Sequence, residues 1–158
     1  AMDTMNLWID TKHAELERAF SKVDLVIINE AEVRQFTREA NLIKGARMIL
    51  ALGPKTMVIK RGEYGVLMVT RDAIFAAPAY PLEEVFDPTG AGDSFAGGFM
   101  GYLAKTGSLD IDNLRRAVIY GSVMGSFCCE KFGVDRFRTL TREEIEARYR
   151  EFQDCTTF

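Results

Sequence analysis

A glycine-rich loop in the second half of the chain has residue types and a spacing suited to binding an anion. The loop reads Asp87-Pro88-Thr89-Gly90-Ala91-Gly92-Asp93-Ser94-Phe95. It leads into a predicted helix, so the backbone N–H groups from Gly90 to Asp93 should be unpaired at the positive end of the helix dipole. Gly90 and Gly92 allow sharp backbone conformations and let a phosphate approach without obstruction by side chains. The loop therefore predicts an anion site.

Asp93 decides which anion chemistry is expected at this loop. A carboxylate aimed at an anion repels it, unless the carboxylate accepts a proton from the group that attacks the anion. An anion site beside a fixed carboxylate is what phosphoryl transfer to a hydroxyl requires. A second interpretation stays open, in which Asp93 is only a favourable acid in the first helical turn and the glycines only form a tight turn.

Two other kinds of phosphate-binding loop do not fit the spacing. A P-loop ends in Gly-Lys followed by Ser or Thr, and this tripeptide does not occur in the chain. A dinucleotide-binding fingerprint counted from Gly90 and Gly92 needs a small residue at position 95, where Phe95 stands. Both interpretations are therefore excluded.

The elements before the loop have the pattern of an α/β protein with parallel strands. Apolar runs of strand length occupy residues 5–9, 25–28 and 56–60. Helical patterns separate them: a first helix capped by Thr11 and continuing to Val23, then stretches at 32–36 and 42–52, the last ended by Gly53-Pro54. This alternation predicts right-handed β-α-β crossovers.

The pattern changes after residue 60. A turn signal at 62–65 separates the preceding strand from two short strands at 66–69 and 74–77, which we expect to form an antiparallel meander. Three helices should follow, at about 90–104, 111–128 and 142–152. The third begins with a capping box formed by Thr141 and Glu144.

Length and composition indicate a single soluble domain over residues 1–158. The chain has 158 residues, of which 47% are hydrophobic, and a net charge of −3. This charge creates no field that would gather nucleic acid or an anionic membrane. No segment reaches the roughly 20 apolar residues of a membrane span, and Cys128, Cys129 and Cys155 have no zinc-binding spacing. We expect a cytoplasmic protein with reduced thiols.

The loop at 87–95 resembles the second signature of the ribokinase-like (PfkB) kinases, with Pro88 in place of the commoner threonine. The resemblance implies that Asp93 is the general base for a substrate hydroxyl. It also implies that the amides of Gly90, Ala91 and Gly92 stabilise the transferring phosphoryl group of ATP. Asp87 and Thr89 fall where some members bind a monovalent cation such as K⁺.

Two further segments resemble parts of the family's nucleotide site. Asn29 and Glu32 match an Asn-x-x-Glu motif and would place Mg²⁺ and its waters on the phosphates, although the same residues also suit a plain helix cap. Lys60 and the glycines that follow it match a nucleotide-facing strand end, although a solvated lysine is the alternative for Lys60. The two glycines after Lys60 are Gly62 and Gly65. By the same resemblance, Ser122 falls near adenine.

The resemblance covers about residues 3–152 and only the second half of the family fold. It implies a Rossmann-type layered α/β/α architecture, of which this chain is the C-terminal, nucleotide-binding half. The N-terminal half, which supplies most contacts to the sugar or nucleoside acceptor and a lid, is not in the chain. We therefore expect the isolated chain to be inactive. Two other classes stay open: a nucleotide-binding regulatory module, and a fragment that assembles with the other half or as a homodimer.

Overall fold

The computed structural model describes residues 1–157 and divides the chain into two compact units. The first comprises Ala1–Gly62 and Val66–Ala76. The second comprises Glu63–Gly65 and the chain from Ala77 onward. A single domain over residues 1–158 stays a prediction, because two units of this size can belong to one domain.

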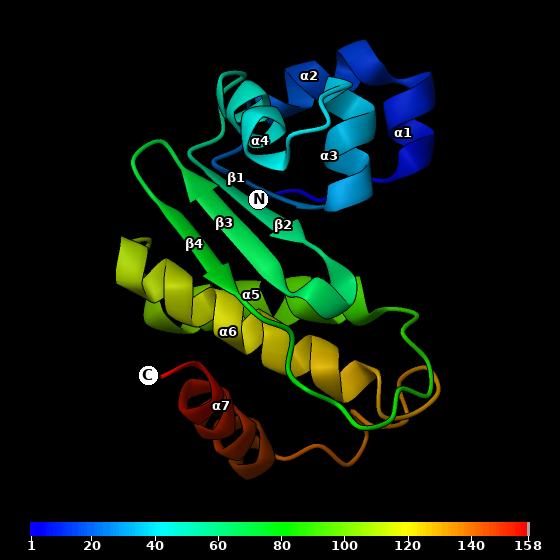
Figure 1. The fold of residues 1–158 in the computed structure, drawn as a ribbon, viewed down its shortest axis with the longest axis vertical. Helices are drawn as coiled ribbons and strands as arrows, with labels where there is room; N and C mark the ends of the chain where they lie inside the picture. Colours follow the sequence, from blue (N-terminus) through cyan, green and yellow to red (C-terminus); the bar gives the residue numbers. More distant parts are fainter. Residues whose placement is uncertain (158) are drawn as a thin grey trace. The chain divides into compact units, whose positions relative to one another are not determined.

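The first unit contains the sheet, whose strands follow one another in the order of the chain (Figure 1). Its four strands are β1 (Leu25–Asn29), β2 (Thr56–Lys60), β3 (Val66–Thr70) and β4 (Ile74–Ala77). β1 runs parallel to β2, with Leu25 opposite Thr56 and Asn29 opposite Lys60. β2 runs antiparallel to β3. The predicted parallel crossover and antiparallel step are therefore confirmed.

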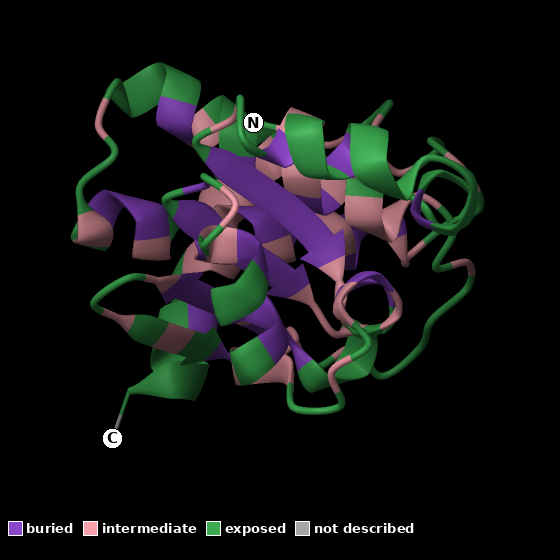
Figure 2. Cartoon of the chain, turned by 90° about the horizontal axis from the view of Figure 1, so that it is seen from above, coloured by how far each residue is buried: buried purple, intermediate pink, exposed green. Residues whose placement is uncertain are grey.

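Four helices accompany these strands: α1 (Asn6–Thr11), α2 (His13–Phe20), α3 (Glu30–Thr37) and α4 (Leu42–Leu50). The core of the unit is apolar and forms where Phe20, Val33 and Ile49 of the helices meet the strands. The strand residues in this core are Val26, Ile28, Met57, Ile59 and Val69. Most strand residues of β1 and β2 are buried (Figure 2), which explains why both strands read as uninterrupted apolar runs.

The predicted strand at residues 5–9 is wrong, because these residues lie at the start of α1. Ile9 is buried, whereas Leu7 and Trp8 are about half-exposed, so the run buries one helical face only. Thr11 does not cap the next helix either: it ends α1, and its hydroxyl donates to the carbonyl of Leu7. The strand-like pairing at the N-terminus is a parallel bridge between Met2 and Val26.

The second unit contains three helices, which are α5 (Ala91–Thr106), α6 (Ile111–Cys128) and α7 (Arg142–Thr156). The short 3₁₀ helix η1 (Gly62–Tyr64) occupies the predicted turn. All three predicted helices are confirmed, and the capping box of Thr141 and Glu144 is present. A Cβ on Gly98 would lie 2.8 Å from the carbonyl oxygen of Tyr120, so α5 and α6 approach each other more closely than a larger residue would allow.

Within the described part of the chain, none of the helices combines the length and the apolar character needed to cross a bilayer.

Candidate phosphate-binding and catalytic site

The loop takes the conformation that its glycines predict at one position, Gly90. This residue precedes α5 and has φ 83° and ψ 0°, in the left-handed region that favours glycine. No side chain caps the helix start. Among the residues that the structure describes, the N–H groups of Gly90, Gly92 and Asp93 have no hydrogen-bond partner. The start of α5 therefore offers three unpaired donors where the helix dipole is positive.

Ala91 differs from the sequence-based expectation. Its N–H donates to the carbonyl of Pro88 at 3.0 Å, so this amide closes a turn and is not unpaired. The physical reason is the sharp reversal at Gly90, which brings the carbonyl of Pro88 back over the start of the helix. The candidate anion site therefore has the N–H groups of Gly90, Gly92 and Asp93 as its unpaired donors.

Two carboxylates bracket the loop and have different surroundings. Asp93 is exposed in the first turn of α5, and in residues 1–157 its carboxylate has no hydrogen-bond partner. Asp87 accepts the N–H of Thr89 at 2.9 Å. This N–H, then the Thr89 hydroxyl, and more weakly the N–H of Gly133, hold the pKa of Asp87 below its ordinary value. Asp87 is therefore bonded to the loop backbone, whereas the carboxylate of Asp93 is exposed and has no such bond among the described residues.

The residues at the end of α6 are hydrogen-bonded to the loop. The thiol of Cys128, which is buried, donates to the carbonyl of Thr89 at 3.4 Å. The carbonyl of Cys129 accepts the N–H of Phe86 at 2.9 Å. Both cysteines are free, and burial raises the pKa of the Cys129 thiol. From the sequence these neighbours were expected only to be reduced thiols, since only the fold places them against a loop about 40 residues earlier.

The first unit brings Asn29, Glu32 and Lys60 together, because β1 and β2 are parallel and end side by side. Asn29 accepts the N–H of Glu32 at 2.8 Å, and Glu32 accepts the N–H of Asn29 at 3.1 Å. This capping box starts α3, so the plain helix cap is present. The box occupies one carboxylate oxygen of Glu32, which accepts the N–H of Asn29.

Asp3 joins this group and was missed by the sequence analysis. Lys60 donates to Asp3 at 2.7 Å, and the Lys60 side chain is only 17% exposed. The alternative of a solvated lysine is therefore wrong. Burial, opposed by the hydrogen bond from the Asn29 backbone, raises the pKa of Glu32, and the nearby charge of Asp3 raises it further. Two neighbouring carboxylates, one of them buried, have the oxygen donor chemistry that Mg²⁺ prefers, directly or through water.

The remaining predicted residues have mixed surroundings. Gly65 has φ 85°, and a Cβ there would lie 2.1 Å from the carbonyl oxygen of Ala77, so its glycine is needed for backbone packing. Gly62 has φ 56° and open space around it. Ser122 is half-buried on α6, and its hydroxyl has no hydrogen-bond partner in residues 1–157. Asn29, Glu32, Lys60 and Gly62 belong to the first unit, whereas the loop, Gly65 and Ser122 belong to the second.

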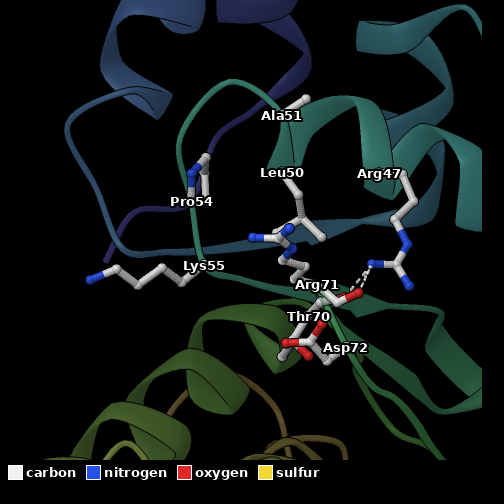
Figure 3. Close-up of a pocket in the computed structure, with 8 residues that line it drawn as sticks. All are labelled: Arg47, Leu50, Ala51, Pro54, Lys55, Thr70, Arg71 and Asp72. Carbon is white, nitrogen blue, oxygen red and sulfur yellow. Dashed lines mark hydrogen bonds between the residues drawn. The ribbon is translucent and has the colours of Figure 1, made fainter.

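A cavity of about 500 Å³ lies elsewhere, at the amino end of β2 in the first unit (Figure 3). Its walls include Leu50, Pro54 and Arg71. Arg47, which also lines it, donates to the carbonyls of Thr70 and Arg71 at 2.6 and 2.5 Å. The cavity contains none of the predicted site residues.

A family model for the pfkB carbohydrate kinases matches residues 2–140. The chain belongs to this family. The match includes both the loop at 87–95 and the strand-end residues, so the resemblance seen in the short motifs extends over most of the chain.

Individual pfkB kinases resemble the chain over part of their length. A cytidine kinase of Thermococcus kodakarensis is 44% identical over 54% of this chain and 31% of its own length. A ribokinase of Staphylococcus aureus is 30% identical over 78% of this chain and 40% of its own. A solved E. coli protein in complex with ATP and Mg²⁺ is 26% identical, with a TM-score of 0.75, over 92% of this chain and 45% of that one. The chain thus spans less than half the length of these relatives.

Proposed function

We propose that this chain is the nucleotide-binding part of an ATP-dependent kinase that phosphorylates a hydroxyl of a sugar or a nucleoside. The observation that supports this most is the start of α5, where three unpaired amides and the unpartnered carboxylate of Asp93 follow the left-handed turn at Gly90. The relatives named above include sugar and nucleoside kinases, and one of them holds ATP and Mg²⁺.

Each group in the loop has a distinct task in this proposal. Asp93 accepts the proton of the attacking hydroxyl, so that the oxygen can bond to the γ-phosphorus of ATP while the bond from that phosphorus to the bridging oxygen of ADP breaks. The amides of Gly90, Gly92 and Asp93 donate to the phosphoryl oxygens as charge develops. Asp87 keeps Thr89, and with it the loop, in position.

Mg²⁺, when bound, neutralises charge on the phosphates. In this proposal Glu32 and Asn29 hold its water molecules through their side-chain oxygens. Lys60 contacts phosphate when it exchanges its ion pair with Asp3 for the nucleotide. Gly62 leaves room for adenosine, because nothing lies within 4 Å of a Cβ at this position. Ser122 offers an unused hydroxyl for the base. A monovalent cation at Asp87 and Thr89 stays a prediction.

The acceptor is held by parts of the protein outside these residues in this proposal, since the chain spans less than half the length of its relatives. The isolated 158 residues should then bind adenine nucleotides weakly and transfer little phosphate. Alignment of the acceptor with the γ-phosphorus supplies much of the catalysis in this reaction class, so a base and an anion site alone are not enough.

The deciding experiment incubates the full-length protein with ATP, Mg²⁺ and a panel of sugars and nucleosides, and measures ADP and phosphorylated product. The 158-residue chain is assayed beside it. We expect one acceptor class to be phosphorylated by the full-length protein and neither by the chain alone. ATP binding without transfer to any acceptor would favour a regulatory nucleotide-binding module, and efficient transfer by the chain alone would contradict the division of tasks.

A further inference from the structure

Two arginines, one between α6 and α7 and one in α7, bind one carboxylate just after the end of α6. Glu130 accepts a hydrogen bond from Nε of Arg136 at 2.8 Å and another from Nη2 of Arg148. The side chains of Glu130, Arg136 and Arg148 are 24%, 13% and 15% exposed. Such charge-assisted bonds, partly removed from water, hold their partners more firmly than exposed ion pairs do. We call these three residues the Glu130 clamp.

The clamp is built around the ring of Phe127, which is buried at the end of α6. The guanidinium carbon of Arg148 lies 3.6 Å from the centre of this ring, and that of Arg136 lies 4.9 Å from it. Arg148 also donates to the hydroxyl of Ser126 at 3.1 Å. Since Arg148 belongs to α7, the clamp fixes the last turn of α6 against α7. Its planar guanidinium groups stack and bond at the same time, which lysine cannot do.

The residues just before Glu130 are those that hold the phosphate loop. Cys129 accepts the N–H of Phe86, one position before Asp87, and Cys128 donates to the carbonyl of Thr89. These two hydrogen bonds lie on either side of Asp87 in the chain and fix the loop there. A shift of Glu130 would move both contacts, because Cys128, Cys129 and Glu130 are consecutive.

We propose that Arg136 and Arg148, acting through Glu130, are positioning residues for phosphoryl transfer, because they fix the segment that aims the loop at 87–93. This inference rests on the proposed function. Among the described residues, no hydrogen bond or ion pair joins either arginine to the loop at 87–93. Their effect on turnover is geometric.

The first test compares turnover in full-length variants. Glu130→Gln keeps the size of the side chain and removes the charge that both arginines bind. We expect kcat to fall at least about 10-fold, since small misplacements of reacting groups cost this much or more, while KM for the acceptor stays within about 2-fold. Arg148→Lys should lose most of the same activity. The matched control is Arg138→Gln, which removes an exposed arginine paired with Asp135 in the same segment and should leave kcat unchanged.

A double-mutant cycle tests whether Arg148 acts through Glu130. The variant carrying both Glu130→Gln and Arg148→Gln should lose little more activity than Glu130→Gln alone, because both changes break one clamp. Losses that multiply would overturn the proposal. If Glu130→Gln does not fold, Arg148→Lys, which keeps a positive charge near Phe127, is compared with the wild type and with Arg138→Gln instead.

The second test is hydrogen exchange, which needs no activity. Glu130→Gln should speed amide exchange in the peptide containing residues 86–92 by about 10-fold or more, with α2 and β1 unchanged. Arg138→Gln should change neither. Unchanged exchange at 86–92, or equal acceleration throughout the protein, would overturn the positioning role. Absence of any kinase activity in the wild type would instead contradict the proposed function, and exchange alone would then decide the coupling.

Discussion

The ammonium group of Lys60 lies 2.7 Å from the carboxylate of Asp3, although 57 positions separate them in the chain. The pair places a mostly buried cation at the carboxyl end of β2, next to Asn29 at the end of β1. A cation in this place either contacts the nucleotide or only binds the N-terminal segment to the sheet.

Lys60→Met in the full-length protein separates these two roles. If Lys60 contacts phosphate, KM for ATP should rise about 10-fold, because a hydrogen bond to a charged group contributes about 1.5–3 kcal/mol. The control is Lys55→Met, whose lysine is highly exposed and paired with Asp24 at 2.7 Å at the other end of β2. It should leave KM unchanged. An unchanged KM in both variants would restrict Lys60 to the ion pair with Asp3.

Asp93→Asn should lower turnover by at least about 100-fold, the lower end of what a positioned general base contributes. The affinity for ATP should stay close to that of the wild type, because the amide keeps the size of the side chain and removes a negative charge beside the phosphates. Turnover and nucleotide binding are measured separately. Loss of both together would make Asp93 a structural residue of the helix start, and retained turnover would exclude it as the base.

Gly90→Ala should destabilise the protein by about 1–2 kcal/mol, because alanine is strained at a φ of 83°. A Cβ at this position meets only Cys128 Sγ, at 3.7 Å, so the cost is conformational and not steric. Turnover should fall at least about 10-fold as the amides are redirected. Gly97→Ala is the control, since this helical glycine has open space around it and alanine should stabilise α5 by roughly 0.5–1 kcal/mol. Denaturant unfolding and kinase assays measure both effects.

Glu32→Gln should change both metal dependence and the pH dependence of stability. Burial raises the pKa of Glu32 in the folded protein, so the folded state keeps this proton to higher pH than the unfolded state does. Wild-type stability contributed by this group therefore falls as pH rises from the ordinary glutamate pKa through the raised one. Glutamine keeps the capping box and does not titrate. As pH rises through this range, the free energy of unfolding of the variant should therefore increase relative to that of the wild type.

In the same variant, the Mg²⁺ concentration for half-maximal activity should rise about 10-fold, as for other residues that orient a metal's ligands. Glu15→Gln on the exposed surface of α2 is the control for both measurements. Mg²⁺ dependence equal to that of the wild type would remove Glu32 from the site. A stability profile parallel to that of the wild type would mean that its carboxylate is not destabilised by burial.

Local patterns explain which elements could be predicted. The strand at 56–60 and the helix at 111–128 were predicted with the bounds that the structure has, because the strand is a short apolar run between turn signals and the helix starts at a capping aspartate, Asp110. The prediction at 5–9 was wrong because a short run with four apolar residues fits a buried strand and the start of a helix equally well. The two alternatives differ in which residues are buried. Only the folded chain shows that Ile9 is buried while Leu7 and Trp8 are about half-exposed.

The sequence by itself determined the conformation of the loop at Gly90 and the position of Asp93, because a left-handed glycine, a helix start and a first-turn carboxylate depend on neighbouring residues only. The tertiary structure decided everything that joins distant segments. It pairs Lys60 with Asp3, places Cys128 beneath Thr89 and binds Glu130 with arginines from beyond the end of α6. These contacts depend on which surfaces meet when the core is buried, and no short-range pattern records that choice.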